Sequence, residues 1–378
     1  MKIKGVLFAV LGTFFVLVMS SPSAAVDPGP IDAVLKKTVL GDQDFKVIDD
    51  FLTQAVQDLV RTRDFTAIAQ ARTVILSRTS TQGQYAQRFS ESAHRAIQAG
   101  FEQAQSLRPD ERKTNVNISL LILIDGLHDL RLADLAIPWL KDKNMVVRYW
   151  AVHALTNAAA LAQLDSGASS DPTLASTIVA RLKEVVDDSS PEILAQMAGF
   201  AAGVKVPQGE DLLLQVADVR IKRYAEWIVK QESYDVGLLK LLESKIPSLS
   251  AGLGPTAPGA IAGKPAVAQR FAQLYSYAIQ RYIKGSERGL LNDAQKRQLI
   301  AVLVETEEKC IGRLLNRPQL TIRRAIEKES MAALLDEHNK LLGTETTPGE
   351  LPSKLGFDYG SNRKAPVLLP DPPQKTGN

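Results

Sequence analysis

The chain has one cysteine, few aromatic residues and almost no excess of charge. Because Cys310 is the only cysteine among 378 residues, no disulfide can form within the chain. Aromatic residues make up 6% of the sequence, which disfavours helical enzymes that stack sugars on many rings. A formal net charge of +3 argues against strong general attraction to nucleic acid or to an anionic membrane. We therefore expect no nucleic-acid partner.

The sequence also lacks the common catalytic and metal-binding motifs. It contains no His-Glu-x-x-His, no Gly-x-Ser-x-Gly and no Cys/His cluster. The histidines, none of which pairs with another at metal-ligand spacing, are His94, His128, His153 and His338. The densest polar group comprises Asp125, His128, Asp129 and Asp134. A divalent metal could bind there, but we favour a helix end with a charged turn, and we expect no catalytic residue, metal or cofactor.

Isolated reactive groups are interpreted as structural. Cys310 lies between charged and apolar helix positions, with no His or Asn nearby in sequence to activate it, so we expect a core thiol rather than a nucleophile. The carboxylate pairs Asp187–Asp188 and Glu307–Glu308 stand where a charged turn or a solvated face is expected. Basic clusters occur at Arg220–Arg223 and between Arg313 and Arg324, and we favour ordinary surface charge for both.

Long apolar runs are missing except near the start of the chain. Lys2 and Lys4 precede an apolar run, Val6–Met19, and Ser23–Ala25 supplies small residues. This is the three-part pattern of a secretory signal peptide. The run is shorter than the ~20 residues that span a bilayer. We predict a cleaved signal peptide over residues 1–25, a secreted or periplasmic protein and no membrane span after cleavage. An uncleaved membrane anchor is the alternative.

The rest of the chain shows helical periodicity and little alternation of apolar and polar residues, which predicts an all-α fold without a sheet. Helices are expected over Asp44–Val60, Gln87–Leu107, Asn115–Leu127, Val267–Lys284, Asp293–Leu315 and Leu320–Leu342. Asp218–Ile246 is expected to form one long helix, or two with a break near Ser233 or Gly237. Asn292 and Gln295 have the spacing of a capping box for the helix that follows them.

The most informative stretch is Leu132–Leu161, which predicts two amphipathic helices joined by the short polar turn KDKNM. Such a hairpin cannot bury its apolar face alone and needs stacked neighbours. Its characteristic residues are Asp142, Val147, Arg148, Ala151, Ala154 and Leu155. They resemble the core of bacterial HEAT-like repeats, which is an Asp followed by Val-Arg-x-x-Ala-x-x-Ala-Leu.

The resemblance implies an α-α superhelix in which Asp142 lies in the turn within the repeat. It also implies that Arg148 opens the second helix and that such charges pair between neighbouring repeats. Pro138 stands closer to this Asp than the family pattern places it, so the first helix is expected to end differently. A weaker second copy, Ile178–Val204, has Leu194 in the place of the Arg.

Composition divides the chain further. Residues 247–266 are rich in Gly, Pro and Ala and predict a linker. It would separate a HEAT-like domain, residues 26–246, from a C-terminal helical bundle, residues 267–343. Residues 344–378 contain many prolines and few apolar anchors, which predicts a mostly disordered tail. Its segment APVLLPDPP is either a polyproline-type docking motif or part of a tail that is solvated or strapped across its own domain.

The resemblance implies a binding scaffold rather than an enzyme. If the hairpin stacks as in HEAT proteins, its second helix lines the binding face, where Tyr149 and His153 are candidate partner-binding residues. Alternatively, these two side chains pack on the adjacent repeat. We expect an exported, non-enzymatic, protein-binding scaffold with an unidentified protein partner. The alternatives are an enzyme or metal-dependent hydrolase on an α/α scaffold, and a helical protein associated with the cell envelope.

Overall fold

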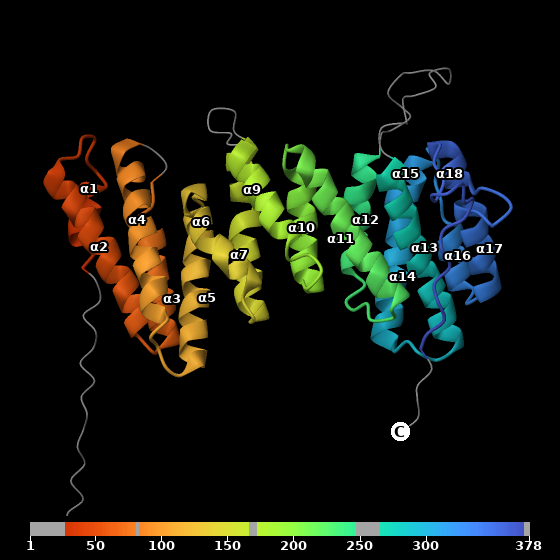
Figure 1. Cartoon of the computed structure of the whole chain (residues 1–378), viewed down its shortest axis with the longest axis horizontal. Coiled ribbons are helices and arrows are strands. Elements are labelled where there is room, and N and C mark those ends of the chain that lie inside the picture. Colours follow the sequence, from red (N-terminus) through yellow and green to blue (C-terminus); the bar gives the residue numbers. More distant parts are fainter. Residues whose placement is uncertain (1–26, 81–82, 166–171, 247–264, 374–378) are drawn as a thin grey trace, which may run out of the picture. The chain divides into compact units, whose positions relative to one another are not determined.

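A computed structural model describes residues 27–80, 83–165, 172–246 and 265–373 and is all-α (Figure 1). In these ranges the only pairing of strand type is an isolated bridge between Gly343 and Pro348. None of the described helices is long and apolar enough to cross a membrane. The predicted signal peptide, and the predicted linker apart from its last two residues, lie outside the described ranges. The chain divides into two compact units, residues 1–96 and 97–378.

In the first unit, helices pack on partners that are close in sequence. Its helices are α1 (Gly29–Val34), α2 (Asp42–Arg61), α3 (Phe65–Leu76) and the first part of α4 (Gly83–Ala104). Helix α2 buries Ile48, Leu52 and Leu59, which share one face at helical spacing, and it packs on both α1 and α3. Asp64 begins α3 because its carboxylate accepts hydrogen bonds from two main-chain amides of the first turn.

In the second unit most helices pack on partners close in sequence. Its helices up to the predicted linker are the 3₁₀-helices η1 (Leu130–Leu132) and η2 (Ile137–Lys141) and the α-helices α5 (Asp110–Leu127), α6 (Ala133–Ala136), α7 (Met145–Thr156), α8 (Ala158–Asp165), α9 (Pro172–Lys183), α10 (Pro191–Gly203), α11 (Pro207–Ala225) and α12 (Tyr234–Lys245). Those that follow are α13 (Pro265–Glu287), α14 (Asp293–Thr306), the π-helix η3 (Glu307–Ile311), α15 (Gly312–Leu314), α16 (Thr321–Glu327), α17 (Met331–Leu342) and α18 (Glu350–Leu355). Helix α5 packs on α7, α7 on α10, α10 on α11, and α11 on α13.

The second helix of the predicted hairpin is present as α7, whereas the first is broken into η1, α6 and η2. Pro138 explains the break, since a proline lacks a main-chain N–H and restricts the residue before it. Helix α7 begins after Asn144, whose side chain accepts hydrogen bonds from the amides of Val146 and Val147. It ends at Thr156, and the next residue, Asn157, is extended, so α8 is a separate helix.

Local signals placed some helix ends correctly and missed others. The capping box of Asn292 and Gln295 is confirmed. The two-helix version of Asp218–Ile246 is also confirmed, with Ser233 as the residue before α12. The single helix predicted over Leu320–Leu342 is wrong, because Glu329 adopts a left-handed conformation and Ser330 caps a new helix, α17.

The residues on both sides of the predicted linker belong to the same compact unit. Helices α12 and α13, which flank it, pack against each other. Gly- and Pro-rich composition indicates where a helix cannot continue, and it does not determine whether the flanking helices separate.

The prediction of a mostly disordered tail does not hold for residues 344–373. This stretch forms α18 and then runs back along the helices of the second unit, at the blue-violet end of the colour bar (Figure 1). Its apolar residues are buried at Leu351, Leu355 and Leu369. Side chains of α13 also bind the tail's main chain, at Asp358, Val367 and Leu369, an effect that composition cannot reveal.

Candidate functional site

Helix α7 carries a half-buried aromatic cluster on one face. The rings of Tyr149 and His153 stack with centroids 5.9 Å apart. Trp150 meets both rings edge-on, at 5.5 Å from Tyr149 and 5.4 Å from His153. Met145 and Val146, one turn earlier, are 52% and 50% exposed. Positions three, four, seven and eight residues apart share a helix face, so these five residues, here called the α7 surface, form one patch.

The opposite face of α7 holds the helix in place. Val147, Ala151 and Leu155 are buried, as their helical spacing predicts, and Ala154 is half-buried. Apolar burial of this kind stabilises by roughly 1.5–3 kcal/mol for each large side chain. The α7 surface is therefore presented by a rigid element rather than by a loop.

Asp125 of α5 fixes the orientation of His153. Its Oδ1 lies 2.8 Å from Nδ1 of His153 and accepts a hydrogen bond of 2.7 Å from Nδ2 of Asn157. One edge of the His153 ring therefore contacts the neighbouring helix, while about a third of the side chain stays exposed.

Asp142 and Arg148 organise the turns instead of forming an ion pair. The carboxylate of Asp142 accepts a hydrogen bond of 2.7 Å from the amide of Asn144. The guanidinium of Arg148 donates to the main-chain carbonyls of Asp142, at 2.8 Å, and of Asp188 in the next turn, at 3.4 Å. Neighbouring turns are thus linked through a carbonyl oxygen.

The polar group predicted around His128 is not brought together into one site. Asp125 is engaged by α7, His128 ends α5 in a left-handed conformation, and Asp129 caps η1. Within the described ranges no group of three or more His, Cys, Asp or Glu residues is placed to hold a metal ion. Cys310 is fully buried, and burial raises the pKa of its thiol to about 12, as a core thiol requires.

Several charged residues have roles that the sequence did not indicate. Glu307, expected on a solvated face, is fully buried and accepts hydrogen bonds from the amides of Ile322 and Arg323 at the start of α16. Arg220, the first residue of the first basic cluster, is not ordinary surface charge, because its side chain is 2% exposed. Three arginines of the second cluster are ion-paired, namely Arg313 with Glu243, Arg317 with Glu350 and Arg323 with Glu308.

A buried ionic network joins α11, α12 and α13. Arg220 pairs with Asp235, and Arg281 pairs with Glu232 at 3.3 Å, with all four side chains at most 4% exposed. Burial raises the pKa of the Glu232 carboxyl. The guanidinium of Arg281 also lies 5.2 Å from the ring centroid of Trp227, a cation–π distance.

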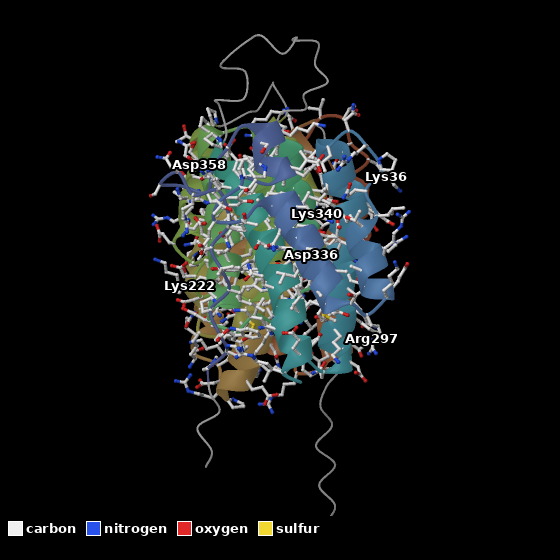
Figure 2. The ribbon with its side chains drawn as sticks, turned by 90° about the vertical axis from the view of Figure 1, so that its right-hand side faces the viewer. Lys36, Lys222, Arg297, Asp336, Lys340 and Asp358 are labelled. Carbon is white, nitrogen blue, oxygen red and sulfur yellow. The ribbon has the colours of Figure 1, made fainter. Side chains whose placement is uncertain are left out.

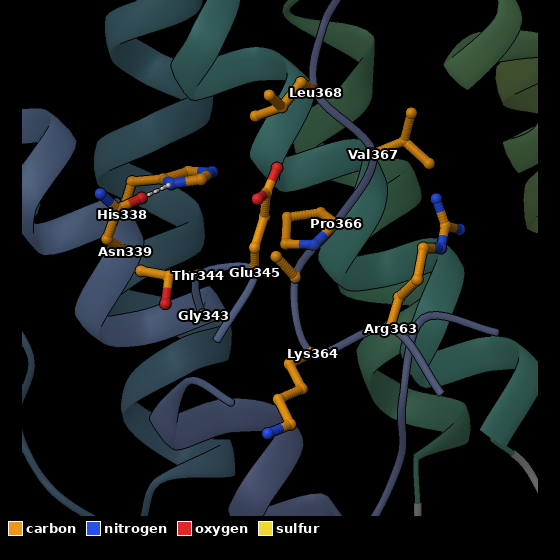
Figure 3. A pocket seen from close by; sticks show the side chains of 11 residues that line it. His338, Asn339, Gly343, Thr344, Glu345, Arg363, Lys364, Pro366, Val367 and Leu368 are labelled. Atoms are coloured by element: carbon orange, nitrogen blue, oxygen red, sulfur yellow. Dashed lines mark hydrogen bonds between the residues drawn. The ribbon is translucent and has the colours of Figure 1, made fainter. Parts of the chain in front are cut away.

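A cavity of about 630 Å³ opens between the end of α17 and the tail (Figure 3). His338 and Asn339 line one side, Glu345 points into the space, and the tail residues Pro366 and Leu368 line the other side. His338 belongs to the buried face of α17, whereas Asp336 and Lys340 lie on its outer face (Figure 2). The cavity has charges of both signs and no cluster that suggests a reaction.

The sequence predicted Tyr149 and His153 but missed the other three residues of the α7 surface. Their spacing from Tyr149 and His153 was a usable signal, because Met145, Val146 and Trp150 fall on the same helical face. Comparison with known proteins finds no family model, no curated protein and no solved structure that matches this chain.

Proposed function

We propose that this chain is an exported, non-enzymatic scaffold that binds a protein partner through the α7 surface. The observation that supports this most directly is the clustering of Tyr149, Trp150 and His153 on one half-exposed helix face. Aromatic side chains are enriched at the centres of protein interfaces, since they bury a large apolar area and lose little conformational entropy on binding.

The architecture proposed around this surface is a HEAT-like superhelical array. The packing of α5 on α7 and of α7 on α10 is what stacked helical repeats require. Arg148 supports the same proposal, since it reaches the turn that precedes α10. Export is the part of the proposal that rests on the signal pattern of residues 1–25.

The proposal is tested by crosslinking in the native host, followed by affinity capture of the tagged chain and mass spectrometry. We expect a protein partner in near-stoichiometric amount that is lost when Tyr149→Ala or His153→Ala is captured instead. Leu335→Ala is the matched control, because Leu335 is an apolar residue of α17 that is 44% exposed and lies outside the α7 surface. The control should keep the partner.

Other results would favour other functions. Capture of no protein, or equal capture with the Tyr149 and control variants, would contradict binding through the α7 surface. A stoichiometric metal lost on His128→Ala would favour the hydrolase alternative. Retention with the cell envelope after salt washing would favour the envelope protein.

A further inference from the structure

The tail segment Ala365–Pro373, here called the strap, is bound to α13 through its main chain. Gln273 makes two hydrogen bonds to one strap residue, because its Oε1 accepts from the amide of Val367 at 2.7 Å and its Nε2 donates to the carbonyl of Val367 at 3.0 Å. Two turns further on, Oε1 of Gln280 accepts from the amide of Leu369 at 2.8 Å. These bonds recognise a main chain rather than particular side chains.

The same pattern continues toward the end of the strap. Lys284 donates to the carbonyl of Leu369 at 2.6 Å, and the indole of Trp227 donates to the carbonyl of Pro370 at 2.9 Å. Asp371 forms ion pairs with Lys284 at 3.0 Å and with Arg288 at 3.1 Å. Besides the main chain, this face of α13 therefore also recognises an acidic residue two positions after the buried Leu369.

The strap buries every third residue. Pro366 and Leu369 are buried and Pro372 is half-buried, whereas Val367 and Leu368 are 40% and 65% exposed. Figure 3 shows the strap running past the cavity with Val367 and Leu368 on it. A period of three residues is that of the polyproline II helix, the conformation in which Pro-rich recognition segments bind.

The groove on α13 is held in shape by contacts that do not involve the strap. Nε2 of Gln280 donates to Oγ of Ser276 at 2.8 Å, and that oxygen lies 2.8 Å from Nε2 of His338. These three side chains are at most 4% exposed. Gln280 therefore has side-chain partners other than the strap, and such pre-organisation favours binding.

We propose that this face of α13 is a binding groove for extended peptides with the pattern Pro-x-x-Leu-Pro-Asp, and that the strap occupies it in cis. The occupant in trans is a partner's peptide with the same pattern. Its proline-rich main chain loses little entropy on binding, and its acidic residue meets Lys284 and Arg288. Exchange is feasible because the strap buries few side chains and leaves two apolar ones exposed.

The test is binding of a fluorescent peptide with the sequence of residues 364–373 to the full chain. The tethered strap has a high effective concentration, so the wild-type chain should bind the peptide weakly. Leu369→Glu places a charge at a position that is 1% exposed and should release the strap while leaving the groove unchanged. This variant should bind the peptide at least tenfold more tightly than the wild type does.

Three controls make the result specific. Leu368→Glu changes an adjacent, exposed strap residue in the same way and should bind the peptide as weakly as the wild type. A peptide that itself carries Leu369→Glu should bind to none of the proteins. Adding Gln273→Ala to the released chain should weaken peptide binding by about tenfold, which corresponds to loss of one or two hydrogen bonds.

Equal peptide affinity of the wild type and of a folded Leu369→Glu variant would overturn the proposal. If Leu369→Glu does not fold, Asp371→Lys provides the test. Asp371 is an exposed strap residue, and the substitution replaces its attraction to Lys284 and Arg288 with repulsion. A gain of threefold or more in peptide affinity supports the groove, and no gain overturns it.

Discussion

Arg220 and Asp235 form a buried, two-pronged ion pair. Nε and Nη2 of Arg220 donate to the two carboxylate oxygens of Asp235 at 2.7 and 2.8 Å, and the two side chains are 2% and 1% exposed. The hydroxyl of Tyr224 donates to the same carboxylate at 2.8 Å. Because α11 supplies Arg220 and Tyr224 while α12 supplies Asp235, the pair fixes how these two helices meet.

Asp235→Ala should lower the free energy of unfolding by about 3–5 kcal/mol, since it leaves the Arg220 charge buried without a partner. Asp218→Ala is the matched control. It removes another Arg–Asp pair, with Arg270 at 3.0 Å, whose carboxylate is 50% exposed, and it should cost at most about 1 kcal/mol. Urea unfolding measures both, and equal losses would show that burial does not determine the strength of the first pair.

His338 should make stability fall in mild acid. Burial lowers the pKa of His338 below its usual 6.5, so the folded chain takes up a proton at lower pH than the unfolded chain does. The contribution of neutral His338 to the free energy of unfolding is therefore retained above pH 6.5. It is lost as the pH falls toward the folded pKa, by at most about 1.4 kcal/mol for each pH unit. His338→Gln should flatten this dependence between pH 7.5 and 5.5 in urea titrations, with pH 7.5 as the reference. If the free energy of unfolding changed equally with pH in the wild type and in His338→Gln, this role of His338 would be contradicted.

Gly343→Ala should disrupt the region where the tail begins. Gly343 has a φ of +109°, and an added Cβ would overlap the carbonyl oxygen of Lys364 and approach the amide nitrogen of Gly349 to 2.8 Å. We expect a loss of about 2–3 kcal/mol and faster proteolysis after residue 343. Gly356→Ala is the comparison, because Gly356 has an ordinary left-handed conformation, with a φ of +67°, and its Cβ would meet open space, so it should cost about 1 kcal/mol. Losses of the same size would show that neither the unusual conformation of Gly343 nor its close neighbours add to the cost.

The signal pattern predicts that the mature protein begins at Val26. Intact mass and N-terminal sequencing of the protein from its native host should find residues 1–25 removed. Ala25→Arg places a large charged residue where small residues are needed and should block this cleavage. A wild-type chain that keeps residues 1–25 would favour the uncleaved anchor instead.

Much of the fold was predictable because helices obey local rules. The burial of Ile48, Leu52 and Leu59 follows from their spacing, and Asn292 and Gln295 cap α14 with atoms only a few residues away. The break at Glu329 carried no comparable signal, because a left-handed Glu has no sequence signature of the kind that Gly or Pro provides.

The candidate site was predictable only in part. Tyr149 and His153 stand opposite the buried Ala151, so their placement follows from one helix alone. Asp125, which orients His153, could not be identified, because it stands 28 residues earlier on another helix. Gln273, Gln280 and Lys284 stand at helical spacing in the sequence. Such a polar stripe predicts a solvated face, and nothing in the sequence indicates that the tail covers it.

Periodicity and capping thus determined the class of the fold and most of its helices, since both act within a few residues. Only the tertiary structure decided that Gln273 binds Val367, 94 residues away, and that Arg220 is a core residue rather than part of a surface cluster. The reason is physical: a polar side chain is stable in the core only where its partners meet it, and those partners come from distant parts of the chain.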